Sequence, residues 1–293
     1  MVTILGKGAW GHALASLLSE NKKDYIFWDR KSPVDPENLV IIAVPTQAIR
    51  EVLTKNKKNL KKATIINTAK GIEKETNKLP FQVAREILGK QIKYSVMSGP
   101  SFASEVEQKM PTMVNLSCLE DGTTICPLVK HYFQTDYFRV WLTNSVQAIE
   151  LAGAVKNVYA IACGISEGLG FAANTRSQIV GLAFEETIAL CKALKYEVAE
   201  NAVEGIMGDL VLTCSSLESR NFRFGRFITR IKAKDALEQV SATVEGYNNC
   251  LSIPYFEKIS GVKLPLARFV YETVRTDSPK TVEKRFRELI KRS

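Results

Sequence analysis

The sequence predicts a doubly wound α/β sheet domain followed by an all-α domain. Up to about residue 145, short apolar runs alternate with amphipathic segments, which is typical of strands and helices in a layered α/β sheet. From about Asn144 the pattern changes to helical periodicity, and convincing strand patterns are absent. We therefore expect a boundary near residues 143–146, with one domain over 1–145 and a helical domain over 146–293.

Seven apolar runs in the first part are expected to be strands. Several are continuous Val and Ile runs, as in strands that are buried on both faces of a parallel sheet. Helical spacing appears between them, for example in AWGHALASLLSEN and LPFQVAREIL. The expected strands are 2–5, 24–28, 38–44, 63–67, 93–98, 112–118 and 138–142.

The second part is expected to be helical, and the chain of 293 residues is long enough for two domains with separate cores. No internal repeat or low-complexity stretch interrupts it. Helical spacing runs through SVQAIELAGAVKNVYAIACGIS, RSQIVGLAFEETIALCKALK, DALEQV and PLARFVYETVR.

The composition favours a cytoplasmic globular protein. Hydrophobic residues make up 45% and charged residues 24% of the chain, which is ordinary for such proteins. No apolar run reaches the roughly 20 residues that cross a bilayer, and the first residues lack the pattern of a signal sequence. The six cysteines form no CxxC pair and accompany only two histidines, so we expect reduced packing thiols, no metal site and no disulfide framework.

A formal net charge of +9 suits anionic ligands. Nucleic acid, phosphorylated metabolites and dinucleotides all fit that charge. The lysines are dispersed, with one modest cluster over 55–62, and no nucleic-acid-binding signature accompanies it. We therefore expect a small phosphorylated ligand, no nucleic acid and no membrane insertion.

A glycine-rich turn follows the first expected strand. The run VTILGKGAWGHALA places Gly6, Gly8 and Gly11 in G-x-G-x-x-G spacing between a strand and a helix, the context that a dinucleotide-binding turn requires. Gly6 would allow the tight turn, Gly8 the approach of a pyrophosphate and Gly11 close packing of helix and strand. A fortuitous glycine-rich turn is the plainer alternative.

The residues after the second expected strand bear on the choice of cofactor. Asp29 suits the free ribose 2′-hydroxyl of NAD, whereas Arg30 and Lys31 suit the 2′-phosphate of NADP. Both remain open, so we expect NAD(P) bound to a Rossmann-like domain.

One lysine lies inside the apolar, small-residue run ELAGAVKNVYAIACG. On a helix, the neighbours of Lys156 three or four positions away are Ala152, Gly153, Tyr159 and Ala160, and none is a carboxylate. Either this lysine snorkels to solvent, or its ammonium faces a ligand that the small residues allow to approach.

Motifs along most of the chain resemble those of the bacterial-type NAD(P)-dependent glycerol-3-phosphate dehydrogenases. In family order they are GKGAWGHALA, AVPTQAI, NTAKGIE, SGPSFASEV, ELAGAVKNVYAIACGISEGLGFAANTRS, GDLVLTCSSLESRNFRFG and VEGYNN. The resemblance implies a Rossmann-like N-terminal domain, a C-terminal domain similar to that of 6-phosphogluconate dehydrogenase, and an active site in the cleft between them. It also implies reversible conversion of sn-glycerol 3-phosphate to dihydroxyacetone phosphate, for phospholipid synthesis, by a homodimer.

The resemblance further implies roles for individual residues. Lys156 matches the proton acceptor, Lys70 a lysine that contacts both cofactor and substrate, and Asp209 completes the catalytic set. The implied substrate-binding residues are Lys70, Gly99, Ser101, Lys156, Asp209, Ser219, Arg220 and Asn221. Cofactor binding is expected of the glycine turn and of the three residues 29–31 after the second strand. The resemblance adds further cofactor-binding residues, which are Ala9, Trp10, Lys70, Ala103, Arg220, Thr243 and Glu245.

Elementary chemistry fits these roles, and each residue also has a plainer explanation. A lysine can donate a proton to a ketone oxygen, but to act as a base near neutrality its pKa of ~10.4 must be lowered by burial or by a cation such as Lys70. The planar fork of Arg220 suits a phosphate, although SRNFRFGR also fits a basic surface loop. Asp209 either orients Lys156 or a substrate hydroxyl, or caps a helix, and Lys70 could simply end a strand.

Two departures from the family pattern stand out. The family usually has some thirty or more additional residues where only RKSPVDPE joins Asp29 to Asn38, so a helix and one strand are expected to be missing. His12 replaces the usual threonine, and we assign it no role. The competing functions are a related two-domain reductase of another small anionic substrate and a non-catalytic dinucleotide-binding protein.

Overall fold

The computed structural model describes residues 1–29, 34, 39–119, 122–276 and 278–292, and its residues form two compact units. The predicted boundary between residues 145 and 146 stays a proposal. The first unit comprises Met1–Glu73, Lys78–Glu150 and Glu197–Ile206, and the second comprises Lys74–Asn77, Leu151–Tyr196 and Met207–Ser293.

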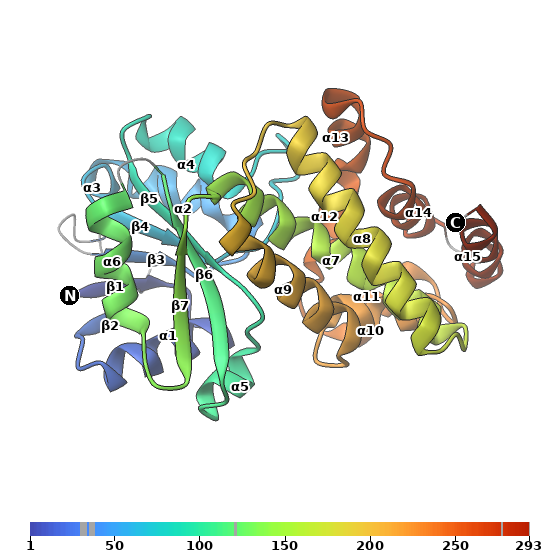
Figure 1. Cartoon of the computed structure of the whole chain (residues 1–293), viewed down its shortest axis with the longest axis horizontal. Helices are drawn as coiled ribbons and strands as arrows, with labels where there is room; N and C mark the ends of the chain where they lie inside the picture. Colours follow the sequence, from blue (N-terminus) through green and yellow to red (C-terminus); the bar gives the residue numbers. More distant parts are fainter. Residues whose placement is uncertain (30–33, 35–38, 120–121, 277, 293) are drawn as a thin grey trace. The chain divides into compact units, whose positions relative to one another are not determined.

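A seven-stranded sheet forms the centre of the first unit, in the order β2-β1-β3-β4-β5-β6-β7 (Figure 1). All seven predicted strands are confirmed, with ends that differ from the prediction by at most two residues. The strands are β1 (Val2–Leu5), β2 (Tyr25–Phe27), β3 (Leu39–Ile42), β4 (Thr64–Asn67), β5 (Lys93–Ser98), β6 (Thr112–Cys118) and β7 (Phe138–Thr143).

The sheet is mixed rather than purely parallel. Strands β1 to β5 pair in parallel, so that Val2 lies opposite both Tyr25 and Leu39, and β6 pairs in parallel with β7. Strand β6 runs antiparallel to β5, with Ser95 opposite Cys118, so the prediction of a parallel sheet was wrong at this pair. A parallel connection needs a crossover back along the sheet, and α5 (Ala103–Glu107), with five residues, is too short to provide it.

Helices of the first unit form two groups. In one, α1 (Ala9–Glu20) contacts α5 and α6 (Gly122–Phe133), and the three share an apolar core with the strands. In the other, α2 (Ile49–Lys55) contacts α3 (Lys57–Leu60) and α4 (Pro80–Leu88) and follows the short helix η1 (Thr46–Ala48). Every position of β1 and β3 is buried, as expected when both faces of a sheet are covered.

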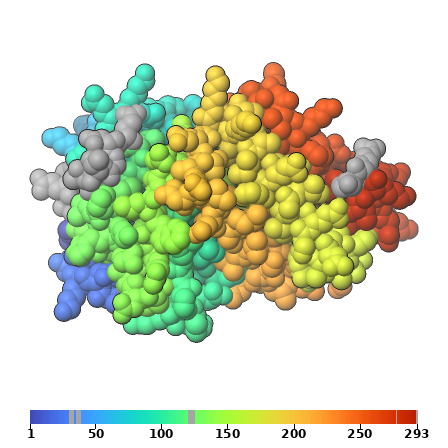
Figure 2. All heavy atoms as spheres, viewed as in Figure 1, coloured from blue at the N-terminus to red at the C-terminus, as the bar shows by residue number. Residues whose placement is uncertain are grey.

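Among its described residues, the second unit has helices and no strands, as predicted. Helix α7 (Val146–Gly168) has its first residues in the first unit and continues in the second from Leu151. Figure 2 shows that α8, in yellow, forms part of the visible surface of this unit. The other helices of this unit are α8 (Ala173–Ala193), α10 (Arg220–Phe227), α11 (Ala233–Val240), α12 (Glu245–Asn249), η3 (Cys250–Ser252), α13 (Ile253–Ser260), α14 (Pro265–Thr273) and α15 (Pro279–Arg292). The short helix η2 (Glu200–Ala202) belongs to the first unit, and α9 (Val203–Ser215) begins there and continues in the second from Met207.

The cysteines differ in part from the prediction. Cys118, at the end of β6, forms a disulfide with Cys126 of α6, because the helix contacts β6 and brings the two Cα atoms to 6.1 Å. The expectation that all six cysteines are reduced was therefore wrong for this pair. The other four are free and buried, and burial raises the pKa of Cys191 and of Cys250 to about 12, as expected of packing thiols.

Helix α7 is the one described helix that is long and apolar enough to cross a membrane. Its most apolar stretch is entirely buried within the protein, which is the behaviour of a core helix. This helix carries Lys156.

Candidate active site

The glycine-rich turn joins β1 to α1. Gly6 has φ +131°, and a Cβ there would lie 2.4 Å from the carbonyl oxygen of Ala43. A Cβ at Gly11 would lie 2.2 Å from the carbonyl oxygen of Gly6, so both positions require glycine. At Gly8, by contrast, no described atom lies within 4 Å of an added Cβ, and Gly8, the N-cap of α1, makes no side-chain capping bond. The turn thus leaves open space beside a helix N-terminus, which suits a pyrophosphate.

The other predicted cofactor residues of the first unit lie near strand and helix ends. Ala9 and Trp10 begin α1, and Ala103 begins α5. Asp29 is exposed two residues after β2, whereas the predicted Arg30 and Lys31 lie outside the described residues. His12 is exposed, and its ring lies 4.9 Å from that of Phe27, so it packs on the surface of the sheet edge.

Three predicted substrate residues come together after β4 and β5. Lys70 donates from Nζ to the carbonyl oxygen of Gly99 at 3.0 Å, and the Ser101 hydroxyl donates to the same oxygen at 3.1 Å. A Cβ at Gly99 would lie 2.8 Å from the Cα of Val114, so a side chain at this position would disturb β6. Lys70 is half-buried, which argues against a solvated lysine at a strand end.

Lys156 is buried, with 7% of its surface exposed, so it does not snorkel to solvent. Its ammonium forms an ion pair with Asp209 of α9 and donates to Thr213 Oγ1 at 2.7 Å. The Thr213 hydroxyl in turn donates to the backbone carbonyl of Asp209, also at 2.7 Å. A carboxylate this close stabilises the ammonium form of a lysine. Asp209 thus contacts Lys156, and it is not a helix cap because it lies inside α9. Its role in orienting Lys156 or a substrate hydroxyl stays a prediction.

Asn221 is engaged at both ends of its amide. Its Nδ2 donates to Asn157 Oδ1 at 2.9 Å, and its Oδ1 accepts from the backbone N–H of Gly246 at 2.9 Å. A Cβ at Gly246 would lie 2.3 Å from the carbonyl oxygen of Asn157. These contacts hold α7, α10 and α12 together at Asn157, the residue that follows Lys156.

The start of α10 carries the predicted phosphate residues. Ser219 is buried and caps α10, accepting from the backbone N–H of Phe222 at 3.2 Å. Arg220 is exposed and donates to the backbone carbonyl of Thr243 at 3.4 Å, so two predicted cofactor residues lie together. Glu245 begins α12, two residues after Thr243.

Two glycines set how α10 packs on α7. A Cβ at Gly164 would lie 2.0 Å from the carbonyl oxygen of Phe222, and a Cβ at Gly225 would lie 2.2 Å from that of Ile161. The two backbones therefore meet without side chains between them. This close crossing brings the beginning of α10 beside the helix that carries Lys156.

Sequence reasoning missed two contributors, Thr213 and Asn157. Thr213 lies four residues after Asp209, so the two share one face of α9, and this spacing could have identified it. Asn157 follows Lys156 directly and is buried. Among the described residues, no group of three or more His, Cys, Asp or Glu side chains is arranged to hold a metal ion.

Comparisons with known proteins agree over both parts of the chain. The family described as NAD-dependent glycerol-3-phosphate dehydrogenase matches through its N-terminal part at residues 1–35 and 29–124, and through its C-terminal part at 145–283. A glycerol-3-phosphate dehydrogenase (NAD(P)+) from Syntrophomonas wolfei is 34% identical, covering 84% of this chain and 82% of the relative. The enzyme of the same name from Staphylococcus epidermidis is 31% identical, covering 99% and 98%.

A solved structure agrees as well. The glycerol-3-phosphate dehydrogenase of Coxiella burnetii superposes with a TM-score of 0.87 and 27% identity, covering 99% of this chain and 98% of that one. The alignment with the Staphylococcus epidermidis enzyme runs over 328 positions, more than the 293 residues of this chain, so that relative has residues that this chain lacks. That they fall between Asp29 and Asn38 stays a prediction. The matches over both parts show that the chain belongs to the NAD-dependent glycerol-3-phosphate dehydrogenase family and is an NAD(P)-dependent oxidoreductase.

Proposed function

We propose that the chain catalyses reversible hydride transfer between NAD(P)H and dihydroxyacetone phosphate, giving sn-glycerol 3-phosphate. The observation that carries this proposal is the buried ammonium of Lys156, held by Asp209 and Thr213. The small residues around it on the helix, such as Ala152 and Gly153, would allow a substrate to approach the ammonium. The names of the relatives support the substrate.

The residues of the first unit fit the cofactor. The open space at Gly8 and the N-terminus of α1 beside it suit the pyrophosphate, and the exposed Asp29 suits the adenosine ribose. When bound, the nicotinamide would accept or supply the hydride. The sequence supports NAD and NADP alike, and we keep both.

Lys156 is the proton donor and acceptor in this proposal. Asp209 and Thr213 take two hydrogen bonds of the ammonium and so fix its orientation. In the reduction, the ammonium donates a proton to the ketone oxygen of the substrate; in the oxidation, the amine accepts the proton of the alcohol. Lys70, held at the carbonyl of Gly99, would contact substrate and cofactor.

The beginning of α10 would bind the substrate phosphate. Arg220 can make two parallel charge-assisted hydrogen bonds, and Ser219 keeps a hydroxyl hydrogen to donate because its oxygen accepts from Phe222. Asn221 supports this site by holding α10 to α7 and α12.

We also propose a cytoplasmic homodimer that supplies phospholipid synthesis. Large apolar side chains are exposed on the second unit, including Leu217, Tyr255 and Ile259 with 40% or more of their surfaces accessible. Such residues suit contact with a second copy of the chain. Sedimentation velocity at micromolar concentration should give twice the mass of the chain, and a monomer at every concentration would reject this part.

The test of the activity is cofactor oxidation in the presence of dihydroxyacetone phosphate, with NADH and NADPH in parallel. Unphosphorylated dihydroxyacetone is the control. We expect oxidation that depends on the phosphate. Oxidation with other small anions instead would favour the related reductase, and cofactor binding without any oxidation would favour the non-catalytic protein.

A further inference from the structure

Lys70 lies in a segment that lacks regular structure. The chain between the end of β4 at Asn67 and the start of α4 at Pro80 contains neither helix nor strand. Irregular segments are more mobile than helices or strands unless side chains hold them. A lysine that must meet a substrate in one geometry therefore needs support for the backbone around it.

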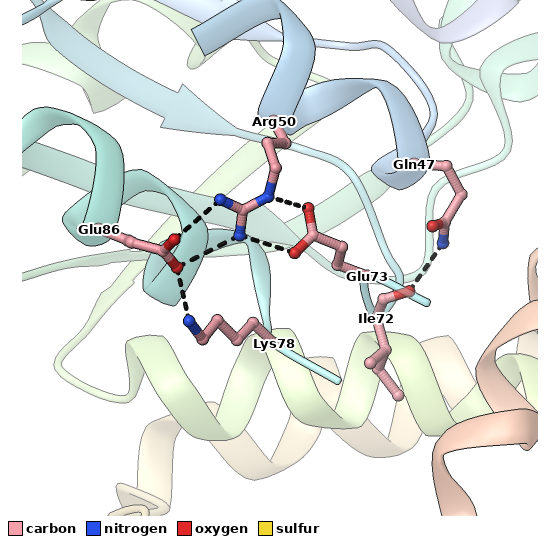
Figure 3. Close-up of polar contacts among 6 residues, drawn as sticks. All are labelled: Gln47, Arg50, Ile72, Glu73, Lys78 and Glu86. Carbon is pink, nitrogen blue, oxygen red and sulfur yellow. Dashed lines mark hydrogen bonds and ion pairs between the residues drawn. The ribbon is translucent and has the colours of Figure 1, made fainter. Parts of the chain in front are cut away.

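Two side chains from η1 and α2 hold this segment just after Lys70 (Figure 3). Gln47 donates to the backbone carbonyl of Ile72 at 2.8 Å. Arg50 donates to Glu73 through Nε and Nη2, each at 2.8 Å, one bond to each carboxylate oxygen. The held residues lie two and three positions after Lys70, so these contacts constrain the backbone from which that lysine extends.

The Arg50–Glu73 pair constrains this segment most strongly, because its carboxylate is buried and two hydrogen bonds join the groups. The side chain of Glu73 is 7% exposed, and that of Arg50 is 34% exposed. A two-pronged pair fixes both groups in orientation, which a single charge contact does not do. Loss of Arg50 would leave a buried carboxylate without its guanidinium, which is costly. The backbone N–H of Glu73 also donates to the carbonyl of Lys78 at 2.9 Å, which closes a turn.

The contacts of Glu86 with Arg50 and Lys78 are more exposed than the Arg50–Glu73 pair. Lys78 therefore offers a control variant for Arg50. Glu86 of α4 accepts from Arg50 at 2.9 Å and from Lys78 at 2.6 Å, and both Lys78 and Glu86 are more than 40% exposed. The hydrogen bonds from Arg50 and then Lys78 lower the pKa of Glu86 to about 2, so it is ionised at neutral pH. Exposed pairs such as Lys78–Glu86 contribute little to stability.

We propose that Arg50 is a positioning residue, which through its two-pronged pair with Glu73 fixes the segment that carries Lys70. This inference rests on the role proposed above for Lys70. It assigns to Arg50 an effect on catalysis without contact to substrate or cofactor. The effect must then disappear when Lys70 itself is absent.

The experiment is a double-mutant cycle on kcat/KM for dihydroxyacetone phosphate, with Arg50→Gln, Lys70→Ala and the double variant. Arg50→Gln should lower kcat/KM about 10- to 100-fold, the loss typical of a misplaced catalytic group. In the Lys70→Ala background, Arg50→Gln should cause no further loss. Equal losses in both backgrounds would overturn the proposal, because a general structural role acts whether or not Lys70 is present.

Two controls keep the result interpretable. Lys78→Ala removes the exposed pair to Glu86 and leaves Arg50 and Glu73 in place, so it should leave kcat/KM unchanged. Arg50→Lys replaces Arg50→Gln if the glutamine variant does not fold. Hydrogen exchange of the amides at residues 69–73 needs no activity, and it should be faster in the Arg50 variant than in Lys78→Ala. Unchanged exchange in the Arg50 variant would overturn the proposal, whether or not the wild-type chain is active. An inactive wild-type chain would separately reject the proposed function.

Discussion

Lys156 takes its partners from another helix, and this explains how a lysine persists in an apolar run. A buried ammonium without partners would be expensive, and the carboxylate of Asp209 together with the Thr213 hydroxyl compensates for the lost water. The partners occur more than fifty residues later in the sequence. The pair is therefore specific to the folded chain.

Arg220 gives a test at the level of one residue. Arg220→Ala should weaken binding of phosphorylated substrate by about 1.5–3 kcal/mol, the usual contribution of a charged hydrogen-bonding group. Because Arg220 is exposed, the free energy of unfolding should hardly change. The KM for dihydroxyacetone phosphate in the variant checks this, and Arg230→Ala, three residues beyond α10, is the control. An unchanged KM would place the phosphate elsewhere.

The sequence could predict Lys156, Asp209 and Lys70 only because motif order supplied their roles. Helical spacing alone could not decide whether Lys156 reaches solvent or faces a ligand. The spacing identifies neighbours on the same helix and not those on a facing helix. The contact of Lys70 with Gly99, and the use of Asn221 to join three helices, depend on tertiary packing that periodicity does not encode.

At the scale of elements, both units use a buried glutamate to bind the start of a helix that begins with proline. Glu150 accepts from the backbone N–H of Phe81 at the start of α4 and from Tyr94. Glu186 accepts from the backbone N–H groups of Leu266 and Ala267 at the start of α14, at 2.6 and 3.1 Å. Each carboxylate thus accepts hydrogen bonds from N–H groups of a first helical turn, which have no partner within their own helix.

These glutamates predict a pH dependence of stability. Burial raises the pKa of Glu150 and of Glu186 from 4.5 to about 7. A carboxyl that binds its proton more tightly in the folded state favours folding at low pH, so the free energy of unfolding should fall as the pH rises from 4.5 to 7. Each group can contribute a slope of up to about 1.4 kcal/mol per pH unit.

Glu186→Gln should reduce that slope, as measured by urea unfolding at several pH values. Glu185→Gln makes the same charge change at the exposed neighbouring residue and should leave the slope unaltered. The account fails for this glutamate if the wild-type free energy of unfolding does not fall over this range, or if both variants behave alike.

The crossing of α7 and α10 predicts another effect at this scale. Gly225→Ala should lower the free energy of unfolding by about 1–3 kcal/mol, as for an overpacked core, because the new Cβ meets the carbonyl of Ile161. It should also raise the KM for dihydroxyacetone phosphate by displacing the start of α10. Gly181→Ala, in the open on α8, is the matched control and should be neutral or stabilising. A Gly225→Ala variant as stable as the control would contradict the close crossing.

At the scale of the whole molecule, the sequence predicted the sheet and the helical part well. Continuous Val and Ile runs identify strands such as β3 because both faces of the sheet are covered. Direction and pairing are less visible: the antiparallel β6 and the bond between Cys118 and Cys126 arise from how α5 and α6 connect the strands. Local patterns do not record such connections.

The most direct test of the account compares wild type with Lys156→Met in turnover of dihydroxyacetone phosphate by NADH. Loss of a proton donor should lower kcat by at least about 100-fold while the dissociation constant for NADH is unchanged. Adding Asp209→Asn removes the charge of the buried carboxylate that has lost the Lys156 ammonium, and it should not restore activity. Lys192→Met on the surface of α8 is the control. The Lys156→Met enzyme should be folded, should bind the cofactor and should be nearly inactive. Near-normal kcat in that variant would contradict the role of Lys156.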